Sequence, residues 1–221
     1  MSTEVFSPAP LTWESTPKQG LVLIMGQRGQ GKSALGWWLA DKVAKETGKG
    51  VVAFGMPQAA QPAILRARKG TTEYVDSMQE INTLKPSVIV VDEASFVVNA
   101  RQSQSNSNQD WLKLAAICRH KDHLLIFISQ HSRQLDIQLV MDCEMVLIKK
   151  PSALHVRAAK PEMKPELNTA LQGFSARPVA DSPKEWVFAV NYLDCTTRWL
   201  NSAMPAWWTE EISKSFQTVE I

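Results

Sequence analysis

The feature that most constrains this chain is a glycine-rich octapeptide directly behind a short apolar run. Residues 26–33 read Gly-Gln-Arg-Gly-Gln-Gly-Lys-Ser, and they follow the apolar run Leu21–Met25. Glycines let a backbone turn tightly, and the first N–H groups of a following helix bind phosphate oxygens. An apolar strand, this spacing and a helix together form the Walker A pattern. The sequence therefore predicts an α/β fold built around a phosphate-binding loop.

Two side chains of the octapeptide indicate what the loop holds. Lys32 supplies a mobile positive charge for the β- and γ-phosphates, and Ser33 supplies a hydroxyl ligand for Mg²⁺. We therefore expect ATP and Mg²⁺ as cofactors, with Lys32 also acting in catalysis. The predicted nucleotide-binding residues are Gly26, Gln27, Arg28, Gly29, Gln30, Gly31, Lys32, Ser33 and Asp92.

A later apolar run, Val88–Val91, ends in the acidic pair Asp92 and Glu93. Because the carboxyl ends of parallel strands meet at one edge of a sheet, these carboxylates are expected beside the loop. Asp92 would hold Mg²⁺ through water together with Ser33, and Glu93 would polarise the attacking water. The acidic pair predicts hydrolysis of ATP to ADP and phosphate rather than nucleotide binding alone.

A neutral amide is expected at the same edge. The apolar run Leu124–Ile128 ends in Ser129 and Gln130. Gln130 would sense the γ-phosphate through a hydrogen bond and transmit that state to the loop that follows. The alternative interpretation is that Gln130 is only a polar cap on the end of a strand.

Five short apolar runs alternate with longer amphipathic or polar stretches. Continuous apolar strands separated by helices indicate a parallel sheet covered on both faces, and so a doubly wound α/β core. The runs are Leu21–Met25, Val51–Phe54, Val88–Val91, Leu124–Ile128 and Met145–Ile148. Helices are expected over Asp110–His120 and behind the glycine-rich loop, where the apolar stripe is Leu35, Trp38, Leu39 and Val43.

We divide the chain into an N-terminal arm (1–19), a core (20–150) and an extension (151–221) that completes the same domain. The polar segment Asn99–Gln109 is expected to be a solvated loop that either faces a partner or simply connects two elements. The extension is expected to hold a strand at Ala153–Ala158, a helix around Glu162–Leu171, a strand at Trp186–Val190 and a tail with Trp207 and Trp208.

The composition excludes several classes of protein. A chain of 221 residues with 44% hydrophobic and 21% charged residues suits one globular domain rather than a disordered or disulfide-stapled protein. No apolar run approaches the roughly 20 residues of a membrane-spanning helix, so a cytoplasmic location is expected. The net charge of +2 neither requires nor excludes a polyanionic partner. Three widely spaced cysteines, Cys118, Cys143 and Cys195, are expected to be core thiols.

The segment from Arg119 to Gln130 resembles a known family. An arginine, a short turn, an apolar strand and a terminal Gln follow one another in the order of the HerA/FtsK superfamily of DNA-pumping ATPases. With the Walker A octapeptide and the acidic pair, the likeness covers residues 20–150. It implies a RecA-like P-loop NTPase core, with a mostly parallel sheet and helices on both faces. It also implies a homo-oligomer, a hexameric ring around double-stranded DNA.

The resemblance further implies a role for one arginine. In that superfamily the arginine ahead of the strand acts in the neighbouring subunit's site, which would make Arg119 a catalytic residue in trans. Arg133 and Arg101 are the reserve candidates. A cation delivered across an interface stabilises transition-state charge and ties hydrolysis to assembly. The alternative is a surface arginine that suits the dipole of a helix end.

Within the superfamily, the chain resembles the minimal genome-packaging ATPases of tailless, membrane-containing icosahedral viruses. This likeness implies a DNA translocase in the host cytoplasm or at a packaging vertex, with a capsid-vertex or membrane-associated protein as partner. A basic stretch is then a candidate channel lining, or merely a solvated face: Lys149, Lys150, Arg157, Lys160 and Lys164. The alternative function is an ATP-gated assembly or targeting module, such as a zonula occludens toxin-like morphogenesis protein or a transposition regulator.

Overall fold

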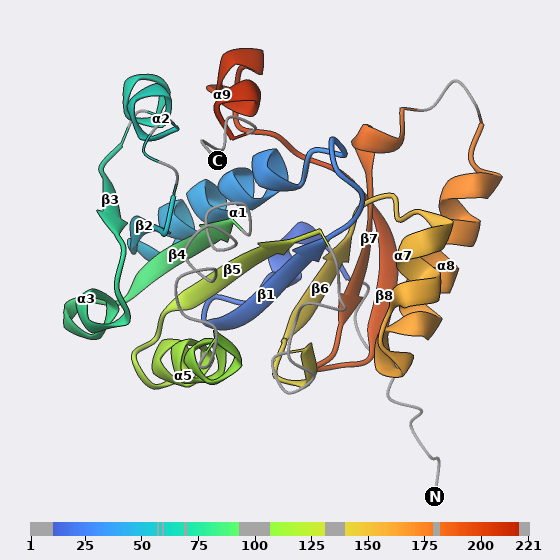
Figure 1. Ribbon diagram of the computed structural model, residues 1–221, viewed down its shortest axis with the longest axis horizontal. Helices are drawn as coiled ribbons and strands as arrows, with labels where there is room; N and C mark the ends of the chain where they lie inside the picture. Colours follow the sequence, from blue (N-terminus) through green and yellow to red (C-terminus); the bar gives the residue numbers. More distant parts are fainter. Residues whose placement is uncertain are drawn as a thin grey trace, which may run out of the picture.

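The computed structural model describes residues 11–56, 58, 60–68, 70–92, 107–130, 140–178 and 182–216. These residues form an eight-stranded sheet in the order β3-β2-β4-β5-β1-β6-β7-β8 (Figure 1). Strands β1 to β6 pair in parallel, whereas β7 is antiparallel to both β6 and β8. The strands are β1 (Gly20–Met25), β2 (Gly50–Phe54), β3 (Thr72–Val75), β4 (Ser87–Asp92), β5 (Leu124–Ser129), β6 (Met145–Ile148), β7 (Trp186–Asn191) and β8 (Thr196–Asn201).

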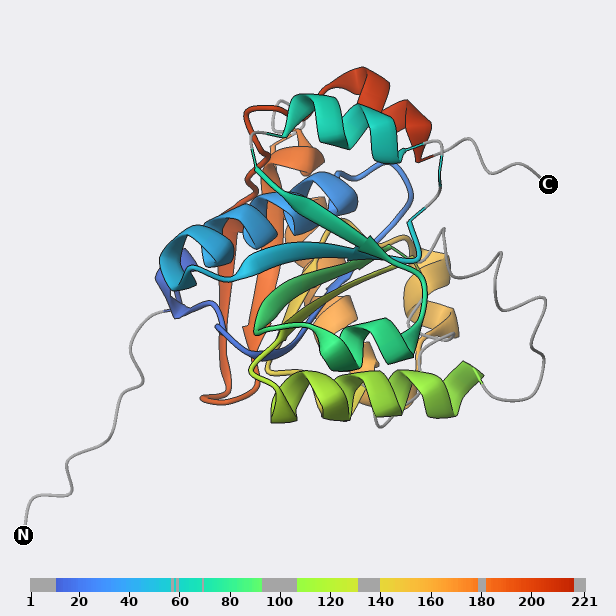
Figure 2. The same ribbon diagram turned by 90° about the vertical axis from the view of Figure 1, so that its left-hand side faces the viewer.

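Helices lie on both faces of this sheet, as predicted. Figure 2 shows α1, α2 and α9 on one side of it, and α3 and α5 on the other. The α-helices are α1 (Lys32–Thr47), α2 (Gln61–Ala67), α3 (Met78–Thr83), α5 (Ser107–His120), α7 (Ala153–Ala158), α8 (Lys164–Ala176) and α9 (Glu210–Ser215). Short 3₁₀ helices are η1 (Trp13–Ser15), η3 (Pro161–Met163) and η4 (Pro183–Glu185). Among the described residues, no helix is both long and apolar enough to cross a membrane.

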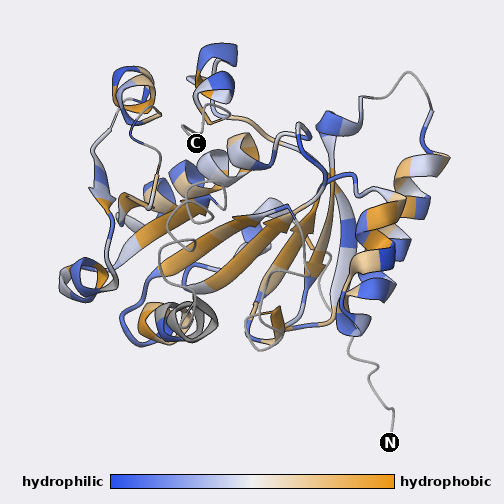
Figure 3. Ribbon diagram, in the orientation of Figure 1, coloured by the Kyte–Doolittle hydropathy of each residue, from blue (hydrophilic) through white to orange (hydrophobic). Residues whose placement is uncertain are grey.

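The apolar runs became the central strands. All five strands predicted for the core are present as β1, β2, β4, β5 and β6, and the strand predicted at Trp186–Val190 is present as β7. Strands β1, β4, β5 and β6 are buried along their whole length. Figure 3 shows these strands as the most hydrophobic part of the fold. Parallel strands with helices on both faces have no solvent side, which is why their sequence is continuously apolar rather than alternating.

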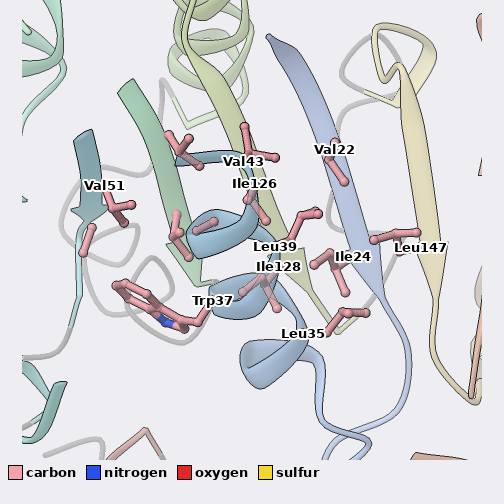
Figure 4. Close-up of a cluster of buried hydrophobic side chains, with 14 of the residues drawn as sticks. Val22, Ile24, Leu35, Trp37, Leu39, Val43, Val51, Ile126, Ile128 and Leu147 are labelled. Carbon is pink, nitrogen blue, oxygen red and sulfur yellow. The ribbon is translucent and has the colours of Figure 1, made fainter. Parts of the chain in front are cut away.

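Alternate residues of β1 enter two separate cores. Val22 and Ile24 lie in one buried cluster with Leu35 and Leu39 of α1 (Figure 4). Leu23 lies in the other cluster, on the opposite face of the sheet. The pleat of a strand places successive side chains on opposite faces, so this one strand anchors both helical layers.

The apolar stripe predicted for α1 packs on the core, but it omitted the fully buried Trp37. Trp37 has 0% of its surface exposed, whereas Trp38 is only half-buried and contacts Trp13 at the edge of the fold. The reason is an extra layer, because the tail folds back over α1. Trp207 packs edge-on against Trp37 with ring centroids 5.9 Å apart, and its Nε1 donates to Asp41 Oδ2 at 2.7 Å. The tail therefore anchors on its own chain.

The strand predicted at Ala153–Ala158 was wrong, because this segment is helix α7. Ser152 caps the helix, since its Oγ accepts the backbone N–H of His155 at 3.2 Å. Alanine and leucine favour a helix, and of the six helical residues only Val156 is buried. The helix expected around Glu162–Leu171 is present, shifted to Lys164–Ala176 as α8.

Other parts of the chain were missed or are only partly covered. Strands β3 and β8 and helices α2 and α3 were not predicted, and β8 is the half-exposed edge strand. Within the polar segment 99–109, residues 99–106 lie outside the described residues, and Ser107–Gln109 form the first turn of α5. Cys118 and Cys143 are buried as expected, but Cys195 is exposed in the turn between β7 and β8.

Lys149 is buried inside the protein and is not a surface cation. Its exposed fraction is 0%, and its Nζ donates to the carbonyl oxygen of Lys184 at 2.6 Å and to Ser202 Oγ at 2.8 Å. Burial lowers the pKa of Lys149 to about 7. The inclusion of Lys149 in a basic channel lining or a solvated face was therefore wrong, because the chain itself encloses the amine.

The lowered pKa of Lys149 predicts a pH-dependent stability. Between the folded pKa of about 7 and the usual pKa of 10.5, the unfolded chain binds more protons at Lys149 than the folded chain does. The contribution of Lys149 to the free energy of unfolding therefore rises with pH in this window. Relative to Lys149→Met, the wild-type free energy of unfolding should gain up to about 1.4 kcal/mol per pH unit within this window.

Urea denaturation at pH 7, 8 and 9 measures this difference. Lys164→Met, which removes an exposed lysine from α8, controls for the change in net charge. A wild-type minus Lys149→Met difference that stays constant with pH would contradict the assignment.

Candidate nucleotide-binding site

The glycine-rich octapeptide forms a loop between β1 and α1. Strand β1 ends at Met25, and α1 begins at Lys32 with Gly31 as its N-cap residue. The first backbone N–H groups of a helix have no partner inside the helix, and they lie at the positive end of its dipole. α1 continues for 16 residues, so the loop leads into a long helix dipole. This is the arrangement that the Walker A pattern predicted for phosphate binding.

The base of the loop is held by the end of β6. A Cβ atom at Gly26 would lie 2.6 Å from the carbonyl oxygen of Lys149, and the φ of Gly26 is +142°. The N–H of Lys149 donates to the carbonyl of Met25 at 2.8 Å, and the N–H of Gln27 donates to the carbonyl of Lys150 at 3.0 Å. The sequence did not identify residues 149 and 150 as this support, because it depends on the pairing of β1 with β6.

The two predicted Mg²⁺ ligands are in contact. Ser33 Oγ donates to Asp92 Oδ2 at 2.6 Å, and Asp92 is 8% exposed. Mg²⁺ prefers oxygen ligands, so a hydroxyl and a carboxylate this close together fit the ion. Lys32 is also 8% exposed, and its Nζ donates to the carbonyl of Gln27 at 3.2 Å, within the loop. The predicted Mg²⁺ ligands and the lysine predicted to bind the phosphates thus all lie at the loop.

Sheet register brings Gln130 to the same edge. Strand β5 lies between β1 and β4, with Ser129 opposite Met25 and Ile128 opposite Asp92. Gln130 is the next residue after β5 and is half-buried. The structure therefore groups Gln130 with the loop and Asp92. Glu93, Arg101 and Arg133 lie outside the described residues, and their roles stay predictions.

Arg119 lies at the opposite edge of the sheet. It is the penultimate residue of α5, just ahead of β5, whereas the loop follows the far end of the parallel strand β1. A strand of six residues spans about 20 Å, so Arg119 does not reach the loop of its own subunit. Its side chain donates to Glu144 Oε1 at 3.2 Å and to the carbonyl of Asp142 at 2.8 Å. A role of Arg119 in a neighbouring subunit stays a prediction.

The glycines of the loop should differ in what they tolerate. Gly26→Ala adds a clash with the Lys149 backbone and should destabilise the fold by about 1–3 kcal/mol beyond the cost of its conformation. Gly29→Ala is the matched control, because Gly29 has a φ of +77° but no atom within 4 Å of an added Cβ. Its cost should be the backbone strain alone, about 1–2 kcal/mol.

Urea denaturation gives both stabilities, and titration with a fluorescent ATP analogue gives the affinities. We expect Gly26→Ala to lose more stability and more nucleotide affinity than Gly29→Ala. Equal effects of the two variants would show that the Gly26–Lys149 packing does not matter.

Comparison with known proteins adds the family. The ATPase family associated with various cellular activities (AAA) matches residues 22–150, which is more than half of the chain. No curated protein matches the chain significantly. Among solved structures, the chain is similar to the genome packaging NTPase B204 from Sulfolobus turreted icosahedral virus 2. Its complex with AMP gives a TM-score of 0.58 at 11% identity, over 86% of this chain and 100% of that one.

Two further structures show the same likeness. The AMPPCP complex of that NTPase gives a TM-score of 0.57 at 12% identity, over 86% of this chain and 100% of that one. B204, described as the DNA-packaging ATPase from Sulfolobus turreted icosahedral virus, gives a TM-score of 0.54 at 9% identity, over 83% of this chain and 98% of that one. At these identities the likeness concerns the fold, and it confirms the predicted P-loop NTPase architecture. With its phosphate-binding loop and the family match over residues 22–150, the chain belongs to the ATPase family associated with various cellular activities (AAA).

Proposed function

We propose that this chain is an ATP-hydrolysing motor that moves double-stranded DNA, and that it packages a viral genome. The observation that carries the proposal is the grouping of the Gly26–Ser33 loop, Asp92 and Gln130 at one edge of a sheet. Support for packaging comes from the fold, because the similar NTPase B204 is covered over its full length.

The residues of the site suit ATP hydrolysis. The loop N–H groups and Lys32 would hold the phosphates, and Ser33 and Asp92 would hold Mg²⁺, which neutralises charge on the β- and γ-phosphates when bound. Lys32 would exchange its bond to the Gln27 carbonyl for one to a phosphate. Glu93 would polarise the attacking water, and Gln130 would report the γ-phosphate to the segment that follows it.

The proposed motor is a homo-oligomer, a hexameric ring around DNA. Because Arg119 is remote from the loop of its own subunit, its cation serves hydrolysis only from a neighbour. Arg157 and Lys164 remain exposed on α7 and α8 and are the candidate contacts to the DNA backbone. We place the ring in the host cytoplasm or at a packaging vertex, docked on a capsid-vertex or membrane-associated protein.

The first test is ATP hydrolysis and DNA movement by the purified protein. We expect duplex DNA to stimulate hydrolysis, and the protein to displace the third strand of a DNA triplex in an ATP-dependent manner. Lys32→Ala should lower turnover by about 100-fold or more, because the lysine stabilises transition-state charge. Lys45→Ala is the control, since it removes an exposed lysine from the same helix.

The outcome of that test separates the two candidate functions. Nucleotide-dependent assembly without triplex displacement would favour the ATP-gated assembly or targeting module. In that case Glu93→Gln should give a long-lived assembly.

A mixing experiment tests Arg119. Arg119→Ala should lower turnover by about 1,000-fold or more if the arginine completes the site. Lys32→Ala subunits lack a working site but keep Arg119, so a mixture of the two inactive variants should regain activity at sites shared between unlike neighbours. Lys121→Ala, which removes an exposed cation just beyond α5, is the matched control and should stay active.

Turnover measured on the mixture, against each variant alone, decides the question. An inactive mixture, or full activity of Arg119→Ala alone, would exclude the trans role.

A further inference from the structure

Lys149 connects three segments at the edge of the sheet that carries the loop. It follows β6 directly, and its Nζ donates to the carbonyl of Lys184 in η4, just ahead of β7, and to the hydroxyl of Ser202, just after β8. The N–H of Ser202 donates in turn to the carbonyl of Glu185 at 2.6 Å. Because β7 is antiparallel to β6 and β8, the end of β6, the start of β7 and the end of β8 meet here.

The backbone of the same lysine supports the loop. Gly26 packs on the carbonyl oxygen of Lys149, and the N–H of Lys149 donates to the carbonyl of Met25. The side chain and the backbone of Lys149 therefore contact different segments. One reaches the antiparallel strands, and the other holds the first glycine of the phosphate-binding loop.

A buried amine is a costly way to join strands. Taking an amine out of water lowers stability unless its hydrogen bonds are replaced, and an apolar side chain would fill the same space without that cost. Both acceptors of Lys149 are present at 2.6 and 2.8 Å, so the group is bonded rather than merely trapped. Lys184 and Ser202 also lie outside residues 22–150, the part that matches the family. The lysine thus links the loop to strands outside that matched part.

We propose that Lys149 is a positioning residue for the phosphate-binding loop. By fixing residues 149 and 150 to η4 and to the end of β8, it holds Gly26 and Gln27 where the loop N–H groups converge on the phosphates. The inference rests on the proposed nucleotide site and adds to it a control element from the C-terminal strands.

Direct measurement of nucleotide affinity tests this role. Lys149→Met fills the space but removes the donor, and it should weaken binding of a fluorescent ATP analogue by about tenfold. Ser202→Ala removes one acceptor and should have a smaller effect in the same direction. The double variant should bind no more weakly than Lys149→Met alone, because the two residues form one connection.

Asn191→Ala is the matched structural control. Asn191 lies at the other end of β7, where its side chain accepts the N–H of Leu193 at 2.9 Å and contacts Asp194. The substitution should lower thermal stability but leave nucleotide affinity unchanged. If Lys149→Met and Ser202→Ala change only stability and leave nucleotide affinity unchanged, as expected for Asn191→Ala, the positioning role is overturned.

Hydrogen exchange separates this inference from the proposed function. Without nucleotide, amides of residues 26–31 should exchange faster in Lys149→Met and in Ser202→Ala than in the wild type, and not in Asn191→Ala. Unchanged exchange would overturn the positioning role even if the protein binds ATP. Faster exchange in a protein that binds no nucleotide would instead refute the proposed function and leave the mechanical link standing.

Discussion

Gly26 and the end of β6 are packed at backbone contact, and the geometry of the site depends on this packing. Pairing of β1 with β6 places Ile148 beside Met25, so Lys149, the residue that follows β6, faces the first glycine of the loop. Hydrogen bonds from Lys149 to Met25 and from Gln27 to Lys150 fix the chain on either side of that contact. A loop whose direction is set before a ligand arrives loses little conformational freedom on binding. The support for phosphate binding therefore lies in the sheet beneath the loop.

The polar groups at this edge have partners within the chain that a ligand can replace. Asp92 accepts the hydroxyl of Ser33, and Lys32 donates to the carbonyl of Gln27. Groups that are mostly buried would otherwise be left unsatisfied, at a cost of about 1–3 kcal/mol each. A shared cation can take the place of the Ser33 proton, and a phosphate oxygen can take the place of the carbonyl. Binding of a nucleotide and its cation would then replace hydrogen bonds within the chain by contacts to the ligand.

The sequence predicted those parts of the fold that depend on interactions between residues close together in the chain. The buried strands were recognisable because parallel strands are apolar throughout, and the loop because its glycines and Lys32 have a fixed spacing. The position of Asp92 and Gln130 at the same edge of the sheet as the loop followed from strand ends alone. Prediction failed where the answer depends on which segments pack from far along the chain. α7 is the exception, because its capping serine and its alanine and leucine are local helix signals that the strand prediction overlooked.

Two misplaced side chains have the same origin. Trp37 is buried because the tail returns over α1, and Lys149 is buried because β7 and β8 close against β6. Lysine is almost never fully buried, so composition favoured a surface position. Only the antiparallel return of the last two strands brings two acceptors to its amine.

One carboxylate ties Arg119 to the start of the strand that carries the phosphate-binding loop. Glu144 accepts the N–H of Leu21 at the start of β1, and the same side chain pairs with Arg119. Arg119 is 49% exposed and Glu144 only 13%, so the arginine is the partner that is free to turn outward while the carboxylate stays on β1. Arg119 also donates to the carbonyl of Asp142 at 2.8 Å and pairs with the carboxylate of that residue at 3.5 Å, so its guanidinium has partners on two residues. A phosphate is a strong partner for a guanidinium, because it can accept two parallel hydrogen bonds. If the proposed role of Arg119 in a neighbouring subunit holds, its transfer would exchange these contacts for a phosphate, and it would release Glu144 at the opposite end of the strand that carries the phosphate-binding loop.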